Sequence, residues 1–177
     1  MSLPVDPRAL LLQKLKEKIE SAVDDPWFFP SRGTVKGFMG TGPIVIVSRR
    51  PSQGTFADEG ANGLFYEILA KFGLEDSHLT NFVKSRGSKG EPDPSNLNVH
   101  KQFFADELER IGQPYLVVPM GGDAKDPVSA FLITRGTQPY ALLPSYAAMW
   151  YGDDNIEKFS KKVEELATKA RRDGWIR

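Results

Sequence analysis

Continuous runs of β-branched and apolar residues, each followed by a helix-like segment, constrain the fold most strongly. The first run is Pro-Ile-Val-Ile-Val at residues 43–47, and another, Pro-Tyr-Leu-Val-Val, occupies residues 114–118. Uninterrupted apolar runs of this length are typical of strands that are buried on both faces of a parallel sheet. Because such a sheet needs helices in its connections, the pattern predicts an α/β domain.

The segments between these runs have the apolar spacing of amphipathic helices. Helices are predicted over residues 7–23, 60–72, 96–111, 127–133 and 154–172, and two further strands over residues 78–83 and 138–143. This alternation predicts a three-layer α/β/α sandwich with a central, mostly parallel, four-stranded sheet. The length suits a single domain, residues 1–177, in which an N-terminal helix and irregular connection (residues 1–42) pack on the core.

Composition excludes several kinds of chemistry. The absence of cysteine rules out disulfides, a thiolate nucleophile and an iron–sulfur cluster held by cysteine. With only two histidines, a zinc site would need mostly carboxylate ligands, so we expect no metal and no other cofactor. Lys plus Arg and Asp plus Glu are equal at 23 each, so any DNA affinity needs a local basic face. Without an apolar run of membrane-spanning length or a secretory signal, we expect a cytoplasmic protein with no membrane partner, monomeric by default.

Polar residues at the strand ends are the first candidates for a binding site, because parallel sheets bind ligands beyond the carboxyl ends of their strands. Arg49 and Arg50 follow the first strand and are able to bind a phosphate through their guanidinium groups. The alternative is that both are solvated loop charges paired with Asp58 or Glu59. The residue types alone leave these two interpretations open.

Asn81 lies toward the end of the second predicted strand, where the chain leaves the sheet. Its side-chain amide offers a donor and an acceptor, which match the edge of a pyrimidine. The alternative is that the side chain caps the turn by a hydrogen bond to the nearby backbone. The next loop carries three residues that are either phosphate ligands or solvated charges: Lys84, Arg86 and Lys89. We expect His78 to lie remote from this edge and His100 to lie on a solvated helix face. Three aromatic residues after the fourth strand either pack in the loop or stack on bases: Tyr146, Trp150 and Tyr151.

Four segments in the same order resemble motifs of the uracil-DNA glycosylase superfamily, nearest to its iron–sulfur branch and that branch's cluster-free relatives. Residues 44–52 are similar to an apolar strand followed by Gly-Glu-x-Pro-Gly, and residues 79–86 resemble a segment that contains Thr-Asn-x-x-Lys-x-Arg. Residues 115–124 resemble a strand followed by Leu-Gly-x-x-Ala, and residues 143–148 resemble the His-Pro-Ser motif. The resemblance covers approximately residues 42–151.

The resemblance implies a DNA-repair hydrolase that flips a damaged base out of single- or double-stranded DNA and cleaves its N-glycosidic bond in base excision. Asn81 would then read the edge of the base, and Phe56 would stack on it. The positions that would contact the DNA backbone and its phosphates are Ser48, Arg49, Arg50, Pro51, Ser52, Lys84, Arg86, Pro144, Ser145 and Tyr146.

Two positions depart from the catalytic motifs. The first motif's glycine is Ser48, and its acidic or amide residue falls on Arg49, which stays protonated and is unable to act as a general base. The histidine of the last motif falls on Leu143, which has no donor. The candidates to replace the water-activating group lie on the loop that follows the first motif: Asp58, Glu59 and Asn62. The sequence indicates no replacement for the histidine. The sequence therefore leaves open an active glycosylase, a non-catalytic relative that binds DNA, a nucleobase or a nucleotide, and a different enzyme for an anionic small molecule.

Overall fold

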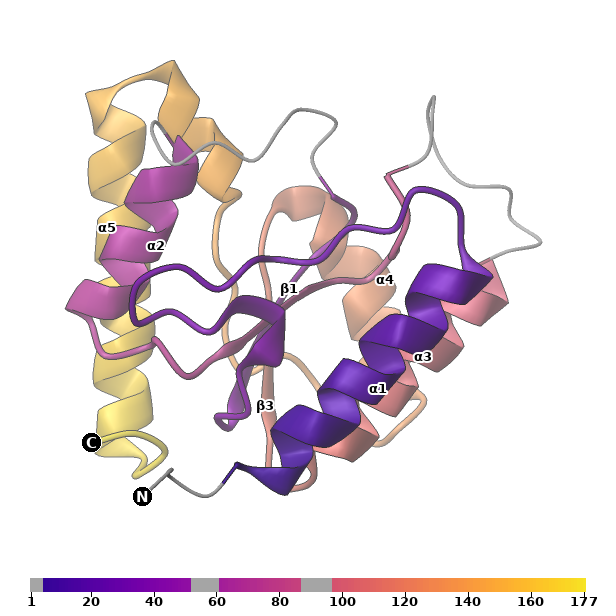
Figure 1. The fold of residues 1–177 in the computed structure, drawn as a ribbon. Coiled ribbons are helices and arrows are strands. Elements are labelled where there is room, and N and C mark those ends of the chain that lie inside the picture. The colour runs from indigo at the N-terminus through magenta and orange to yellow at the C-terminus, as the bar shows by residue number, and fades with distance from the viewer. Residues whose placement is uncertain (1–4, 52–60, 87–96) are drawn as a thin grey trace.

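The structure is a computed structural model that describes residues 5–51, 61–86 and 97–177. Along the chain, these residues form the elements shown in Figure 1: α1 (Pro7–Ala22), η1 (Gly37–Met39), β1 (Ile44–Ser48), α2 (Ala61–Lys71), β2 (His78–Asn81), α3 (Leu97–Ile111), β3 (Leu116–Pro119), α4 (Gly122–Ile133), η3 (Tyr146–Tyr151) and α5 (Asp153–Arg172). Strands and helices alternate from β1 to α4, which confirms the predicted α/β class.

The sheet is parallel and has the strand order β2-β1-β3. The register pairs Ser48 with Asn81 at the carboxyl ends of β1 and β2, and Val47 with Pro119 at the end of β3. Within the described residues the sheet has three strands, so the prediction of a four-stranded sheet was wrong.

The predicted fourth strand, residues 138–143, lies beside β3 but forms only an isolated bridge between Met120 and Leu143. The amide of Tyr140 donates to the carbonyl of Val117 at 2.9 Å, and the amide of Leu143 donates to the carbonyl of Pro119 at 2.9 Å. These bonds are two residues apart on β3 but three residues apart on its neighbour. The extra residue interrupts the ladder in the manner of a bulge, and so no regular strand forms.

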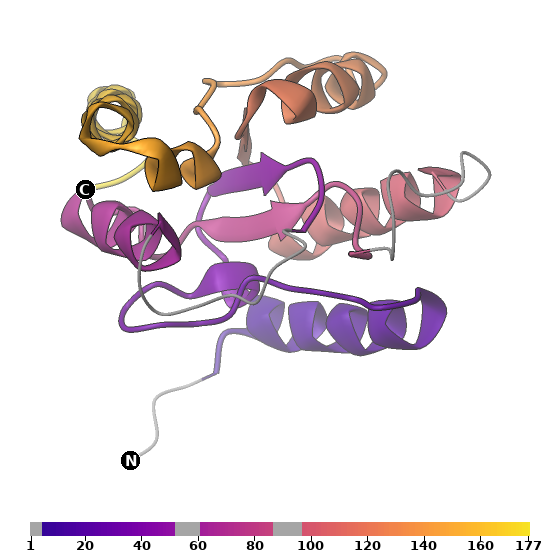
Figure 2. The same cartoon turned by 90° about the horizontal axis from the view of Figure 1, so that it is seen from above.

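Helices cover both faces of the sheet, giving the three predicted layers. Figure 1 and Figure 2 show α2 and α5 on one side of the strands and α3 and α4 on the other. Successive side chains of a strand point to opposite faces. Accordingly, Ile44 and Ile46 pack in the cluster of α2 and α5, whereas Val45 and Val47 pack in the cluster of α1, α3 and α4. We call these sides of the sheet the α2–α5 face and the α3–α4 face.

The N-terminal segment packs on the core through Leu12, Leu15 and Ile19 of α1, which are buried. Helix α1 lies along α3 (Figure 1), with Leu15 and Ile19 in contact with Phe103. In the irregular connection, Phe29 and Phe38 are buried and anchor it to the core. None of the helices in the described ranges is long and apolar enough to cross a membrane.

Helix α4 begins at Gly122, five residues before the predicted start at Pro127. Gly121 has a φ of 98°, and this left-handed conformation turns the chain directly from β3 into the helix. Pro127 lies inside the helix and has no amide hydrogen. The carbonyl of Asp123, four residues earlier, therefore lacks its usual hydrogen-bond donor within the helix.

The close approach of the connection to the loop before β2 requires glycine at position 40. A Cβ atom at this position would lie 2.0 Å from the backbone oxygen of Ser77. We expect Gly40→Ala to lower the free energy of unfolding by about 1–3 kcal/mol, because backbone must move to relieve the clash. Gly122→Ala is the control, since its Cβ would meet nothing within 4 Å. Urea unfolding that gives the two variants equal stability would contradict this account of the contact.

Candidate functional site

The carboxyl ends of β1 and β2 bring Ser48 and Asn81 side by side. The two residues are paired in the strand register, and both side chains lie on the α2–α5 face because Val47 and Phe82 next to them pack on the other. The hydroxyl of Ser48 donates a hydrogen bond to Oδ1 of Asn81 at 2.5 Å. This bond occupies the amide oxygen and fixes which end of the amide carries the remaining donor.

Asn81 has an unsatisfied donor. The residue is 2% exposed, and its Nδ2 is buried with no hydrogen-bond partner among the described residues. A buried polar group without a partner costs about 1–3 kcal/mol. The alternative expected from the sequence, a cap on its own turn, is not observed, because Oδ1 accepts from Ser48 and the backbone oxygen accepts from Nζ of Lys84 at 2.5 Å. A ligand with an acceptor atom would complete the hydrogen bonding of this amide.

Arg49 points to the opposite face of the sheet. Its Nη1 donates to the backbone oxygen of Asp123 at 3.3 Å. This is the carbonyl that Pro127 leaves without an intrahelical partner, so Arg49 satisfies it and ties β1 to α4. Arg50 is half-buried, and its Nη1 is enclosed without a hydrogen-bond partner in the described part of the chain.

The segment that resembles the His-Pro-Ser motif lies beyond β3 at the same edge. Leu143 is 4% exposed and packs in the α2–α5 cluster, where it offers no polar side-chain group. The hydroxyl of Ser145 accepts from the amide of Ala147 at 3.3 Å and so caps η3. Tyr146 is buried and stacks on Phe65 with ring centroids 4.8 Å apart, so its aromatic ring is part of the core.

Burial raises the pKa of Tyr146 to about 12, so its phenol stays neutral. Trp150 and Tyr151, in contrast, are 57% and 85% exposed, which leaves only these two of the three aromatics open to solvent.

Several predicted site residues lie outside the described residues: Ser52, Phe56, Asp58, Glu59 and Lys89. Asn62 is described, and it lies 7% exposed in the first turn of α2. Its amide is able to orient a water molecule but has no titratable proton, so it cannot act as a general base. Pro51 is buried and Pro144 is half-buried at the strand ends. Arg86 is half-buried, with its guanidinium 5.7 Å from the ring centre of Trp27.

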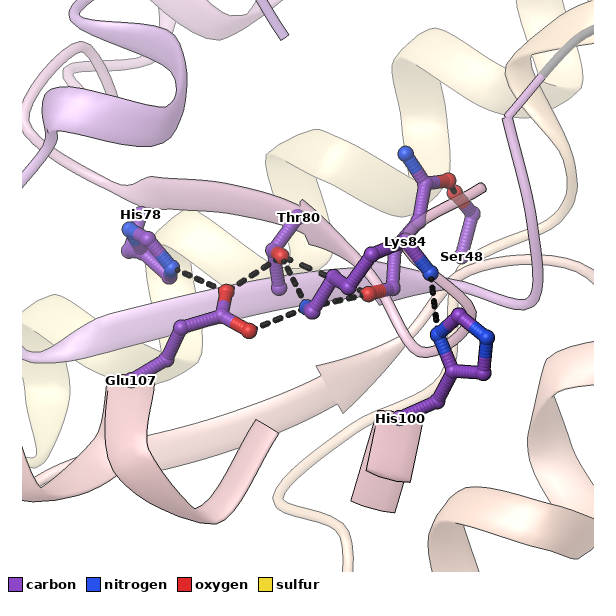
Figure 3. Close-up of polar contacts among 7 residues, drawn as sticks. Ser48, His78, Thr80, Lys84, His100 and Glu107 are labelled. Carbon is purple, nitrogen blue, oxygen red and sulfur yellow. Dashed lines mark hydrogen bonds and ion pairs between the residues drawn. The ribbon is translucent and has the colours of Figure 1, made fainter. Parts of the chain in front are cut away.

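Lys84 belongs to a buried polar network rather than to an exposed basic surface (Figure 3). Its side chain is 1% exposed and forms an ion pair with Glu107 of α3. Glu107 also accepts from Thr80 and lies 2.9 Å from Nε2 of His78. The expectation that Lys84 binds a phosphate is therefore corrected, because its ammonium faces the α3–α4 interior and is occupied by Glu107 and by the oxygens of β2.

This network holds the end of β2 in place. The ammonium of Lys84 bonds to Oγ1 of Thr80 at 2.9 Å and to the backbone oxygen of Asn81 at 2.5 Å. Burial alone would raise the pKa of Glu107, but the Lys84 charge and the His78 hydrogen bond outweigh it and hold this pKa below its usual value. Glu107 is therefore ionised at neutral pH, and the network fixes the backbone from which the Asn81 amide projects.

His100 is buried, and the expectation of a solvated position was wrong. Its Nδ1 accepts a hydrogen bond from the backbone amide of Lys84 at 3.0 Å, which requires a neutral imidazole with the proton on Nε2. Burial, and next the charge of Lys84, lower the pKa of His100. His100 and Glu107 thus join α3 to the loop after β2 from two positions along the helix.

We expect the stability of the protein to fall as the pH drops below about 6.5, where an unfolded histidine becomes protonated. The pKa of His100 is lower in the folded state, so the unfolded state binds more protons in this range and unfolding is favoured. The loss from Glu107 begins only below pH 4.5, the ordinary pKa of a glutamate side chain. Urea unfolding between about pH 8 and pH 5 should show this slope, and His100→Asn should flatten it. An equal slope in the variant would contradict the assignment.

Glu107 is the principal site residue that the sequence interpretation missed. A signal was present, because Glu107 falls among Phe103, Phe104, Leu108 and Ile111 on the apolar side of its helix. A carboxylate in such a position is buried only when it is paired.

In the described ranges, no three His, Asp or Glu side chains are grouped so that they could hold a metal ion. No protein-family model matches the chain, and no curated protein sequence matches it.

Proposed function

We propose that the chain is a glycosylase-like DNA-binding domain that accepts an extrahelical base at the carboxyl edge of β1 and β2 and hydrolyses its N-glycosidic bond slowly. The observation that carries the proposal is the buried Nδ2 of Asn81, which has no partner in the described structure. The resemblance of residues 44–52, 79–86, 115–124 and 143–148 to the uracil-DNA glycosylase motifs supplies the reaction.

The Ser48–Asn81 hydrogen bond supports a particular kind of base. Because Oδ1 accepts from Ser48, the group left to meet a ligand is the Nδ2 donor. A donor pairs with a carbonyl oxygen and not with an exocyclic amine. The position that faces Asn81 would therefore be the one where uracil carries O4, and hypoxanthine and xanthine carry O6, whereas cytosine and adenine carry an exocyclic amine there.

Slow chemistry follows from the residues at the two catalytic positions. Arg49 is bonded to the Asp123 carbonyl on the far face of the sheet, and Leu143 is packed in the core. Neither side chain stabilises a departing anionic base or abstracts a proton from water. Loss of one charge-stabilising donor typically slows such a step by about 10²- to 10³-fold.

A second candidate function, binding without hydrolysis, is favoured by the same two residues. In this case the Asn81 amide would hold the base, with no group to complete the reaction. Both candidates predict that binding depends on Asn81, and they differ only in whether a cleaved strand accumulates.

Single-turnover cleavage of labelled oligonucleotides, with protein in excess, tests the proposal. The substrates carry uracil, hypoxanthine or xanthine, with cytosine and adenine as controls, in single- and double-stranded form. We expect excision of at least one of uracil, hypoxanthine and xanthine, and no excision of cytosine or adenine. Binding of these bases without excision would support the non-catalytic alternative. If the protein neither binds nor excises any of them at low salt, both candidate functions are excluded.

Removing the Ser48 hydroxyl should relax base selection. In Ser48→Ala the Asn81 amide loses the bond that fixes its orientation, so Oδ1 becomes available to accept from an amine. A hydrogen bond contributes about 0.5–1.5 kcal/mol, so the preference for uracil over cytosine should fall by up to about tenfold. Competition binding with the two oligonucleotides measures this ratio, with Ser31→Ala as a control on an exposed serine. An unchanged ratio would contradict a selective role of Ser48.

A further inference from the structure

A cavity of about 320 Å³ lies at the same edge of the sheet but on the α3–α4 face. It is lined by Phe82 and Val83 after β2, by Lys101 of α3, and by Ala130 and Phe131 of α4. Arg49 completes the wall next to β1. Side chains of consecutive strand residues point to opposite faces, so the sheet separates this cavity from Ser48 and Asn81.

The cavity combines an apolar floor with a cationic rim. Phe82 and Phe131 meet edge to face with ring centroids 6.0 Å apart and form the floor. Among the described residues, Arg49 and the exposed Lys101 are the charged members of the lining, and none of its described members is a carboxylate. A lining of this kind matches a ligand that has a planar apolar part and an anionic group.

Pro127 fixes the position of the cationic group. Because Pro127 has no amide hydrogen, the Asp123 carbonyl accepts from Arg49 instead, and this bond holds the guanidinium against α4 at the cavity wall. Pro127 itself lines the cavity. The rim is therefore built by the fold and does not depend on a freely moving surface arginine.

We propose that this cavity is a nucleotide-binding site, distinct from the base site at Asn81, that places a base against Phe131 and a phosphate between Arg49 and Lys101. Its volume lies at the small end of the range of about 300–1,000 Å³ for ligand sites, which fits one nucleotide. Arginine and lysine are the residues that bind phosphate, and aromatic side chains are the usual platform for a base. The nucleotide is either free or part of a DNA strand, because both present the same chemistry.

Calorimetric titration of Asn81→Ala with thymidine 5′-monophosphate at low salt tests this site, since this variant removes the base site from the measurement. We expect binding that is weakened at least about tenfold by Lys101→Glu and by Ala130→Leu, which fills the cavity. The matched controls are Lys125→Glu, on α4 but outside the described lining of the cavity, and Ala70→Leu, an exposed alanine of α2; both should bind as the parent does. Thymidine, which lacks the phosphate, should bind more weakly than the nucleotide.

Titration with a short oligothymidylate distinguishes the two sources of the nucleotide. If Ala130→Leu weakens binding of the free nucleotide but leaves binding of the oligonucleotide unchanged, the site takes free nucleotides. If it weakens both, and the oligonucleotide binds more tightly than the free nucleotide, the site takes a nucleotide of a strand. No binding of either probe, or binding that neither Lys101→Glu nor Ala130→Leu weakens, would overturn the proposal. Because all these proteins carry Asn81→Ala, the outcome is independent of whether the base site functions.

Discussion

Glu107→Gln is expected to destabilise the protein by about 3–5 kcal/mol, the usual effect of removing one partner from a buried ion pair. The variant keeps the shape of the side chain but leaves the ammonium of Lys84 uncompensated at 1% exposure. It also weakens the acceptor that receives hydrogen bonds from Thr80 and His78. Much of this destabilisation is the cost of a buried, unpaired cation.

The double variant Lys84→Met/Glu107→Gln should recover part of the loss, because it removes the unpaired charge. The difference between the double variant and the sum of the single variants measures the coupling of the pair. Glu109→Gln, an exposed position on the same helix, is the control and should change the free energy of unfolding by less than about 0.5 kcal/mol. Urea unfolding in which Glu107→Gln is as stable as Glu109→Gln would contradict the role of the network.

Asn81→Ala is expected to lower base binding by up to about tenfold, the effect of one hydrogen bond. It is expected to lower excision by about 10²-fold, the usual effect on the rate of removing one positioned donor. Its stability should remain close to that of the unchanged protein. The variant loses the Ser48 bond, but it also removes a buried Nδ2 that has no partner among the described residues, and these effects oppose each other.

The separation of activity from stability distinguishes a binding role of Asn81 from a structural one. Asn98→Ala is the matched control, since Asn98 is exposed on α3. Unfolding and excision are measured on the same preparations. Excision that survives in Asn81→Ala, or a loss of excision that only follows a loss of stability, would remove Asn81 from the site.

Much of the fold follows from the sequence because the pattern of apolar residues determines which surfaces can be buried. The run at residues 43–47 has no polar position, and β1 is accordingly the central strand with helices on both faces. The segment at residues 138–143 is also largely apolar but carries one residue too many for the register of β3. Register depends on the partner strand, and the pattern of a single segment does not contain it.

The site was only partly predictable for a related reason. Asn81 and Ser48 occupy the strand ends expected from the sequence. Lys84, in contrast, has the sequence context of a solvated loop charge, because its ion-pair partner Glu107 lies 23 residues further along the chain. Pairing between distant charges is set by helix packing. The direction of Arg49 was likewise hidden, since it depends on the carbonyl that Pro127 leaves available on α4.

The central claim, that the Asn81 amide receives a base, is tested most directly by its side-chain NH₂ resonances in nitrogen-15 NMR spectra, assigned by their absence in Asn81→Ala. A single-stranded oligonucleotide with one uracil is added at low salt, and the same strand with cytosine serves as the control. We predict that uracil shifts these resonances and slows their exchange with water, and that cytosine does not. Resonances that stay unchanged while the uracil strand is bound would show that the base does not reach Asn81.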